Sequence, residues 1–224
     1  MHRAVYRSYQ FFSAVRAYLP RWAGGLAGGL SPEDEALVHA VLPAPDQRDL
    51  FYRMPPNDRR HALAVARTLR QAGYTHPALL QAALLHDAGK SLGQPLIHRV
   101  LIVLLRAFWP SLLHRLGHAD PQTLLDDYAA TSPSPRWPGR AWWRRPFVIH
   151  AHHPAIAAAW AEQAGCLPQA VALIREHEKS EKHKEHPRGI DSPLAAQNSK
   201  FKIQNSQFPA PELLRALQWA DDQN

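Results

Sequence analysis

A histidine and an aspartate stand side by side at the end of an apolar run, as His86 and Asp87 in "AALLHDAGK". Imidazole nitrogen and carboxylate oxygen are both ligands for divalent metal ions. Adjacent residues on a helix point about 100° apart, so they reach one ion only where the helix ends or where neighbouring helices add ligands. Gly89 is expected to end the helix here. The pair therefore predicts a metal site with further ligands elsewhere in the chain.

Two distant residues are candidates for those further ligands. His61, in "DRRHALAVA", shares a helical face with Val65 and Leu69, which should point inward. A histidine on an apolar face is more often a hydrogen-bonded core residue than a ligand, so only the His-Asp pair gives His61 this interpretation. Asp221, in "LQWADD", is near the end of a helix whose apolar residues should be packed. A buried carboxylate is costly unless it is paired or binds a metal.

The order of these residues resembles the HD superfamily of metal-dependent phosphohydrolases, whose pattern is a histidine, a His-Asp pair and a distant aspartate. The matching residues are His61, His86, Asp87 and Asp221, and the resemblance covers about residues 53–222. It implies an all-α domain, a bound divalent ion, and hydrolysis of a phosphomonoester or phosphodiester in a phosphorylated small molecule or nucleotide. These residues specify neither the exact substrate nor an oligomeric state.

The segments "HAHHPAIAAAWAEQAG" and "ALIREHE" resemble the part of HD proteins that binds a second metal, including the HD-GYP branch. The resemblance implies His153 and His177 as second-site ligands, with Asp87 bridging the ions and His152 as a weaker alternative to His153. Glu176 stands where HD-GYP proteins have a histidine and no "GYP" triplet follows, which argues against cyclic dinucleotide hydrolysis. The histidines could instead form an exposed, partly charged cluster, so one ion is expected and a second is left open.

Two imidazoles and two carboxylates suit Mn²⁺, Fe²⁺, Mg²⁺ or Zn²⁺. In an octahedral site, these four ligands would leave one position for water and one for a phosphoryl oxygen. The ion would lower the pKa of the water and neutralise charge growing on phosphorus. His86, Asp87 and Lys90 are the candidate catalytic residues, with Lys90 orienting the phosphate. Alternatively, Lys90 only complements the dipole at the end of its helix.

Helical periodicity and turn residues predict an all-α fold, because strand-like alternation never extends beyond a few residues. We expect an N-terminal helical extension over 1–50 and an HD-type domain over 51–224. Residues 179–209 are charged and amide-rich and indicate a mobile insertion, since they have too little apolar surface to offset the ordering entropy. The predicted helices cover 5–19, 31–43, 58–71, 75–88, 98–116 with a break or kink at Pro110, 154–164, 168–179 and 209–224.

The net charge of +7 and the pI near 9.9 favour an anionic partner, such as a phosphorylated small molecule, nucleic acid or acidic lipid. The single cysteine, Cys166, cannot form an intramolecular disulfide and suits a reducing compartment, so a cytoplasmic location is expected. Arg7 and Arg16 interrupt the N-terminal apolar residues, unlike in a signal peptide. The run at 100–105 is too short for a transmembrane segment and predicts a buried helix, with contact to a membrane surface left open.

Two alternatives to catalysis are open at the level of sequence. Residues 135–146 interleave three tryptophans with four arginines, which could stack bases and contact phosphates as a nucleic-acid-binding module. A loop held by its tryptophans, with solvated arginines, is the simpler interpretation. The other alternative is a non-catalytic HD domain that binds metal or nucleotide as a sensor.

Overall fold

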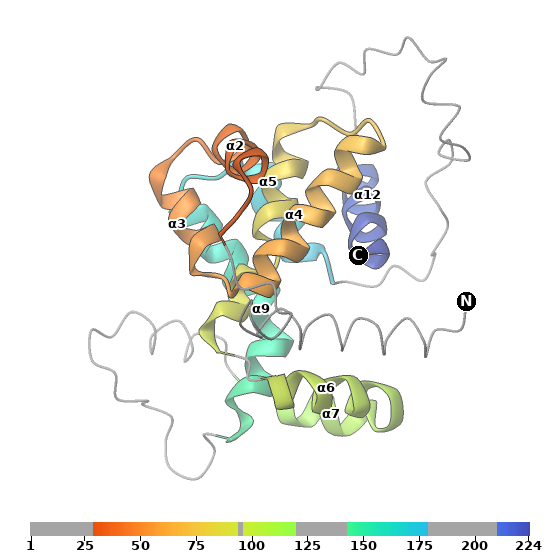
Figure 1. The fold of residues 1–224 in the computed structure, drawn as a ribbon. Coiled ribbons are helices and arrows are strands. Elements are labelled where there is room, and N and C mark those ends of the chain that lie inside the picture. Colours follow the sequence, from red (N-terminus) through yellow and green to blue (C-terminus); the bar gives the residue numbers. More distant parts are fainter. Residues whose placement is uncertain (1–28, 94–95, 120–142, 179–209) are drawn as a thin grey trace.

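The computed structural model describes residues 29–93, 96–119, 143–178 and 210–224. These ranges form helices and contain no strand, which confirms the all-α prediction. The predictions for 5–19, for most of the tryptophan-rich loop and for the insertion at 179–209 concern residues outside them. The helices (Figure 1) are α2 (Pro32–Val41), α3 (Pro45–Arg53), α4 (Pro56–Gln71), α5 (Pro77–Leu85), the 3-10 helix η2 (Ala88–Leu92), α6 (Leu96–Phe108), α7 (Pro110–Gly117), α9 (Arg145–Gln163), α10 (Pro168–Glu176) and α12 (Ala210–Gln223).

Proline fixes where most of these helices begin. α2, α3, α4, α5, α7 and α10 each have proline in the first turn, where its fixed φ suits the helix and its missing N–H needs no partner. Ser31 also caps α2 by accepting a hydrogen bond from the backbone N–H of Asp34. Gly73 and Gly165, with φ of 88° and 69°, follow α4 and α9 in a conformation that glycine adopts readily.

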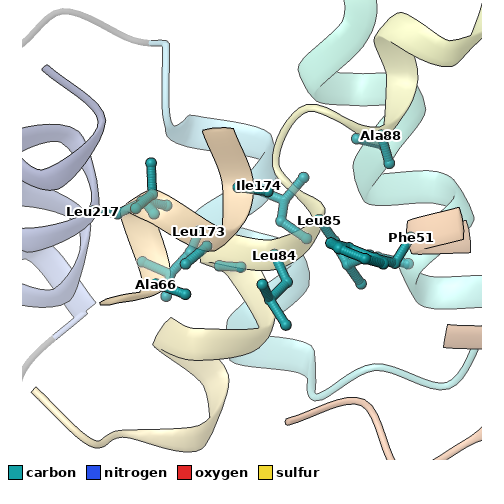
Figure 2. Packing of buried hydrophobic residues seen from close by; sticks show 14 of the residues in the cluster. Phe51, Ala66, Leu84, Leu85, Ala88, Leu173, Ile174 and Leu217 are labelled. Atoms are coloured by element: carbon teal, nitrogen blue, oxygen red, sulfur yellow. The ribbon is translucent and has the colours of Figure 1, made fainter. Parts of the chain in front are cut away.

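Helix α5 forms the centre of the main core. Every residue of α5 after Pro77 is buried, which explains why the helix is apolar on all sides apart from Gln81. Gln81 is hydrogen-bonded to the carbonyl of Val41 and to the backbone N–H of Leu167. Figure 2 shows Leu84 and Leu85 of α5 together with core residues of α3, α4, α10 and α12. The residues of the candidate centre are thus carried by helices that share one core.

The α6–α7 hairpin lies at one edge of the molecule, away from the core around α5 (Figure 1). Its inner face has a smaller cluster of its own, in which Ile102 and Leu105 pack against Phe147 of α9. The run at 100–105, predicted to be buried, is therefore buried only in part. By length and composition, none of the described helices could cross a membrane alone. Two helical segments at 106° to each other, Pro77–Leu92 and Ile97–Phe108, reach the length and apolar composition of a membrane span only when they are taken together.

Several local predictions differ from the structure. α9 begins at Arg145 and not at Pro154, so Pro154 lies inside a helix. α5 ends at Leu85, and Gly89 lies within the 3-10 helix that follows. α3 has no counterpart among the predicted helices, and the expected domain boundary between residues 50 and 51 falls within it. α2 and α3 contribute to the same hydrophobic cluster as α4 and α5.

Candidate metal centre

His86 and Asp87 lie at the turn between α5 and η2. The backbone N–H of His86 makes the last helical bond of α5, to the carbonyl of Ala82 at 2.8 Å, and Asp87 directly precedes η2. Both side chains are buried, and Nε2 of His86 lies 3.7 Å from Oδ1 of Asp87. Neighbours within a regular helix would diverge by about 100°. The two side chains nevertheless approach each other at the end of α5, where neighbouring helices can add ligands.

The two ligands predicted from distant helices lie beside this turn. Nε2 of His61 on α4 is 2.8 Å from Oδ1 of Asp221 on α12, and that oxygen is 3.5 Å from Nε2 of His86. The ligand atoms of His61, His86 and Asp87 all lie within 4.8 Å of one another. Ligands at about 2.1 Å from one octahedral ion are about 3 Å apart at right angles and about 4 Å apart across it. His61, His86 and Asp87 therefore form one possible ligand group, and Asp221, which is not in that group, adjoins it through His61 and His86.

Asp87 also belongs to a second group, with His153 of α9 and His177 at the end of α10. The ligand atoms of this group lie within 4.8 Å of one another, and all three side chains are buried. Nε2 of His153 is 3.6 Å from Oδ1 of Asp87. Asp87 is thus common to both groups, as a carboxylate that bridges two ions would be.

A third group contains two residues that are absent from the predicted ligands, His150 and Glu178, together with His153. Nε2 of His153 is 3.7 Å from Oε1 of Glu178. The spacing of three between the two histidines places them on one helical face. A helix that begins at Pro154 would leave both histidines outside it, so their spacing did not point to a shared face in the sequence analysis. No spacing in the sequence singles out Glu178. His152, the alternative to His153, is in none of the groups found among the described residues.

Backbone carbonyls fix the ring orientation of three histidines. Nδ1 of His86, His153 and His177 is hydrogen-bonded to the carbonyl oxygen three residues earlier, at 3.0, 2.8 and 2.7 Å. A carbonyl oxygen only accepts, so Nδ1 must carry the hydrogen, and in the neutral ring Nε2 keeps its lone pair. Such a hydrogen bond on the second ring nitrogen is typical of histidines that bind metals.

These carbonyls are available because the helical ladder is interrupted nearby. The carbonyls of Ala83 and Ile174 lie in the last turns of α5 and α10. In α9, the carbonyl of His150 would normally accept from residue 154, but Pro154 has no N–H, and Nδ1 of His153 donates instead. Pro154 therefore frees the acceptor that orients His153.

Two candidate ligand atoms lack a hydrogen-bond partner. Nε2 of His86 and Nε2 of His153 are buried, and neither has a hydrogen bond within the described part of the chain, whereas Oδ1 of Asp87, which both face, has Nζ of Lys90 at 2.7 Å. Both nitrogens lie within 3.7 Å of that one oxygen. Buried polar atoms are almost always hydrogen-bonded, because leaving them unpaired costs free energy. A divalent cation between Asp87 and these two nitrogens would satisfy both of them.

Three of the histidines are held neutral. Burial lowers the pKa of His150 and His177 to about 4 and that of His153 well below its usual value. Positive charge adds to this effect, from Lys90 on His150 and His153 and from His86 on His177. Metal ligation requires deprotonated nitrogen. These three rings therefore meet that requirement at neutral pH.

His86 is held in the opposite state by its carboxylate neighbours. Burial lowers its pKa, but Asp87 and Asp221 outweigh burial and raise it to about 9. Burial raises the pKa of Asp87, but Lys90 and the surrounding histidines hold it well below its usual value. His61, which is hydrogen-bonded to Asp221, and His86, whose Nε2 is 3.5 Å from it, likewise lower the pKa of Asp221 against the effect of burial. The centre therefore has two carboxylates whose charge a proton on His86 or a metal ion can balance.

The 3-10 helix η2 adds two contacts to the centre. Nζ of Lys90 is 2.7 Å from each carboxylate oxygen of Asp87, so the lysine predicted to orient a phosphate holds the aspartate. Gly89 lies against the backbone of His153, and a Cβ built on it would be 2.3 Å from the His153 carbonyl oxygen. Glycine permits this close approach of η2 to α9. The approach keeps Asp87 near His153.

The described part of the tryptophan and arginine segment makes structural contacts. Arg144 donates hydrogen bonds to the carbonyls of Arg115, Leu116 and His118, at the end of α7. Trp143 packs edge-on against Phe147, with ring centroids 6.4 Å apart. Residues 135–142 lie outside the described ranges. For Trp143 and Arg144, these contacts favour the interpretation as a packed loop over a nucleic-acid surface.

Comparisons with known proteins assign no family to this chain. No family model matches it, and no match was found among curated proteins or solved structures. The interpretation of the centre therefore depends on the geometry above and on the order of the ligands in the sequence.

Proposed function

We propose that this protein is a metal-dependent phosphohydrolase of the HD type. One divalent ion would be held by His61, His86, Asp87 and Asp221, and a second by the group that Asp87 shares with His153. The substrate would be a phosphomonoester or phosphodiester, in particular in a nucleotide. The proposal is supported by the order of the ligands along the chain and by their approach in space from α4, the α5–η2 turn, α9, α10 and α12.

The observation that carries the proposal is the pair of buried imidazole nitrogens, Nε2 of His86 and Nε2 of His153, that face Asp87 without a hydrogen bond. In a purely structural network, His86 and His153 would each have an acceptor or donor at hydrogen-bond distance. Instead their Nε2 atoms are fixed by carbonyl bonds at Nδ1, and both lie 3.6 to 3.7 Å from one carboxylate oxygen. This distance is too long for a hydrogen bond and suits two ligands that flank an ion.

In such a reaction, the chain's own residues would orient the metal ligands and balance charge. A bound divalent ion supplies Lewis acidity and lowers the pKa of a coordinated water. The carbonyl bonds at Nδ1 hold the imidazoles in place, and Asp87 contributes to both ligand groups. Lys90 places an ammonium group beside Asp87, from which it can donate to a phosphate oxygen.

Metal content and turnover test the proposal together. The purified protein is analysed by inductively coupled plasma mass spectrometry, and nitrophenyl mono- and diesters and a nucleotide panel are assayed with Mn²⁺, Fe²⁺, Mg²⁺ and Zn²⁺. We expect His86→Ala to lose both bound metal and activity. His152→Ala is the matched control, because this ring is beside His153 on α9 but in none of the ligand groups. It should retain both.

Two outcomes would change the proposed site or the proposed function. Full turnover by the His86→Ala variant would contradict the proposed site. Bound metal without turnover on either ester class would favour the second candidate function, a metal or nucleotide sensor.

A further inference from the structure

Helix α6 has a stripe of exposed apolar side chains. Ile97, Leu101, Leu104 and Phe108 are spaced by four, three and four residues, which places them on one helical face. Their exposed fractions are 74%, 42%, 46% and 67%. Single exposed apolar residues are ordinary in proteins, but a continuous apolar face marks a binding surface.

The stripe continues around the corner of the hairpin. Trp109, between α6 and α7, is 62% exposed, and its ring centroid is 6.0 Å from that of Phe108. The inner face is packed independently of these residues, by Ile102 and Leu105 against Phe147. The outer side chains therefore contribute little to the stability of the hairpin. We call them the hairpin ridge: Ile97, Leu101, Leu104, Phe108, Trp109 and Leu112.

The hairpin has basic residues and no acidic ones. Residues 96–119 include no aspartate or glutamate, and of their arginines Arg99 is paired with Asp58, which leaves Arg106 and Arg115 as its positive charges outside that ion pair. Helices with an apolar face, aromatic side chains and basic charges lie in membrane interfaces, where anionic headgroups attract the charges. The composition of the hairpin therefore has two features of an interfacial membrane element, an apolar face and a single sign of charge.

We propose that the hairpin ridge docks on a bilayer surface containing anionic lipids, with the Phe108–Trp109 corner entering the headgroup region. The hairpin lies at an edge of the molecule (Figure 1), which suits contact with a broad surface. A second copy of the chain fits less well, because ridge-to-ridge pairing would bring together two hairpins that each have Arg106 and Arg115 and no acidic side chain of their own. An anionic bilayer has the complementary charge.

The hairpin is attached to the body by charged side chains. The guanidinium of Arg99 donates to both carboxylate oxygens of Asp58 on α4, at 2.6 and 2.7 Å, and Asp58 is buried. Arg144 ties the end of α7 to the start of α9. Asp58 precedes His61 by three residues on the same helix. Docking of the hairpin would therefore also orient the helix that carries His61 relative to the membrane.

Flotation with vesicles tests the proposal on the full chain. Binding is compared between vesicles of phosphatidylcholine alone and vesicles that also contain phosphatidylglycerol. We expect binding to the anionic vesicles, weakened by salt, and a partition coefficient at least about tenfold lower for the double variant Phe108→Ser, Trp109→Ser. Leu167→Ser is the matched control, because Leu167 is 42% exposed but lies before α10, outside the ridge. It should bind like the unaltered chain.

Three results would overturn docking on an anionic membrane. They are equal flotation with both vesicle types, unchanged flotation of the double variant, and a dimer in light scattering that the double variant abolishes while no vesicles are bound. Circular dichroism checks that the variants fold. Because flotation requires neither metal nor turnover, its failure is distinguishable from a failure of the proposed phosphohydrolase activity.

Discussion

The histidines of the candidate centre differ in the protons that they hold at neutral pH. Burial keeps His150, His153 and His177 neutral, whereas two carboxylates keep a proton on His86. Residue type and order in the chain were sufficient to single out His86 and its predicted partners. The carbonyl bonds that orient the rings could not be predicted, because they depend on where α5 and α10 end and on Pro154 lying inside α9.

Substitution of Gly89 tests the close contact between η2 and α9. In Gly89→Ala, the new Cβ would meet the His153 carbonyl oxygen at 2.3 Å, so one of the two segments must move. We expect the free energy of unfolding to fall by about 1–3 kcal/mol and metal affinity to fall with it. Urea unfolding and metal titration measure the two effects. Gly29→Ala is the control, since nothing lies within 4 Å of a Cβ there; equal behaviour of both variants would refute the packing role.

The reactivity of the single cysteine, Cys166, tests whether its thiol is buried and has a raised pKa. Burial raises the pKa of Cys166 to about 11, so its thiol is neutral in the folded protein at pH 8. We expect Ellman's reagent to react slowly with the native chain at pH 8 and rapidly in urea. Stabilisation by the neutral thiol should be complete below about pH 8.5 and be lost as the pH rises through 11. Immediate reaction under native conditions would show that Cys166 is not buried.

Among the elements, the helices whose ends are marked in the sequence by a capping residue, a proline or a glycine were predicted best. Ser31 with Pro32, and the glycine after α4, indicated α2 and the end of α4 correctly. The start of α9 was wrong because proline usually begins a helix, whereas Pro154 follows nine helical residues. The exposure of Leu101 and Leu104 could not be predicted either, because it depends on which face of α6 packs against α9.

The attachment of the hairpin to α4 depends on one ion pair. Arg99→Met would leave the buried carboxylate of Asp58 without its bidentate partner. We expect a loss of about 3 kcal/mol in the free energy of unfolding, measured by chemical denaturation. Arg67→Met removes an ion pair with Asp34 in which the arginine is half-exposed, so it should cost less than about 1 kcal/mol. Equal losses for the two variants would contradict the anchoring role of Arg99.

For the whole molecule, the central feature is that residues far apart in the chain gather at one turn. His61 and Asp221, separated by 160 positions, are in direct contact. Gln218 of α12 also donates to the carbonyl of His177, which ties α12 to the end of α10. The sequence suggested that these residues belong together only through a resemblance in their order. Their distances depend on how the helices pack around α5, which no local pattern encodes.

Anomalous scattering from crystals grown with Mn²⁺ tests the metal centre most directly. We expect a peak at about 2.2 Å from Nε2 of His61 and His86 and from carboxylate oxygens of Asp87 and Asp221. Lys90 should then have moved away from at least one oxygen of Asp87. No peak at the centre in Mn²⁺-saturated crystals, with Lys90 still on both oxygens of Asp87, would contradict the assignment.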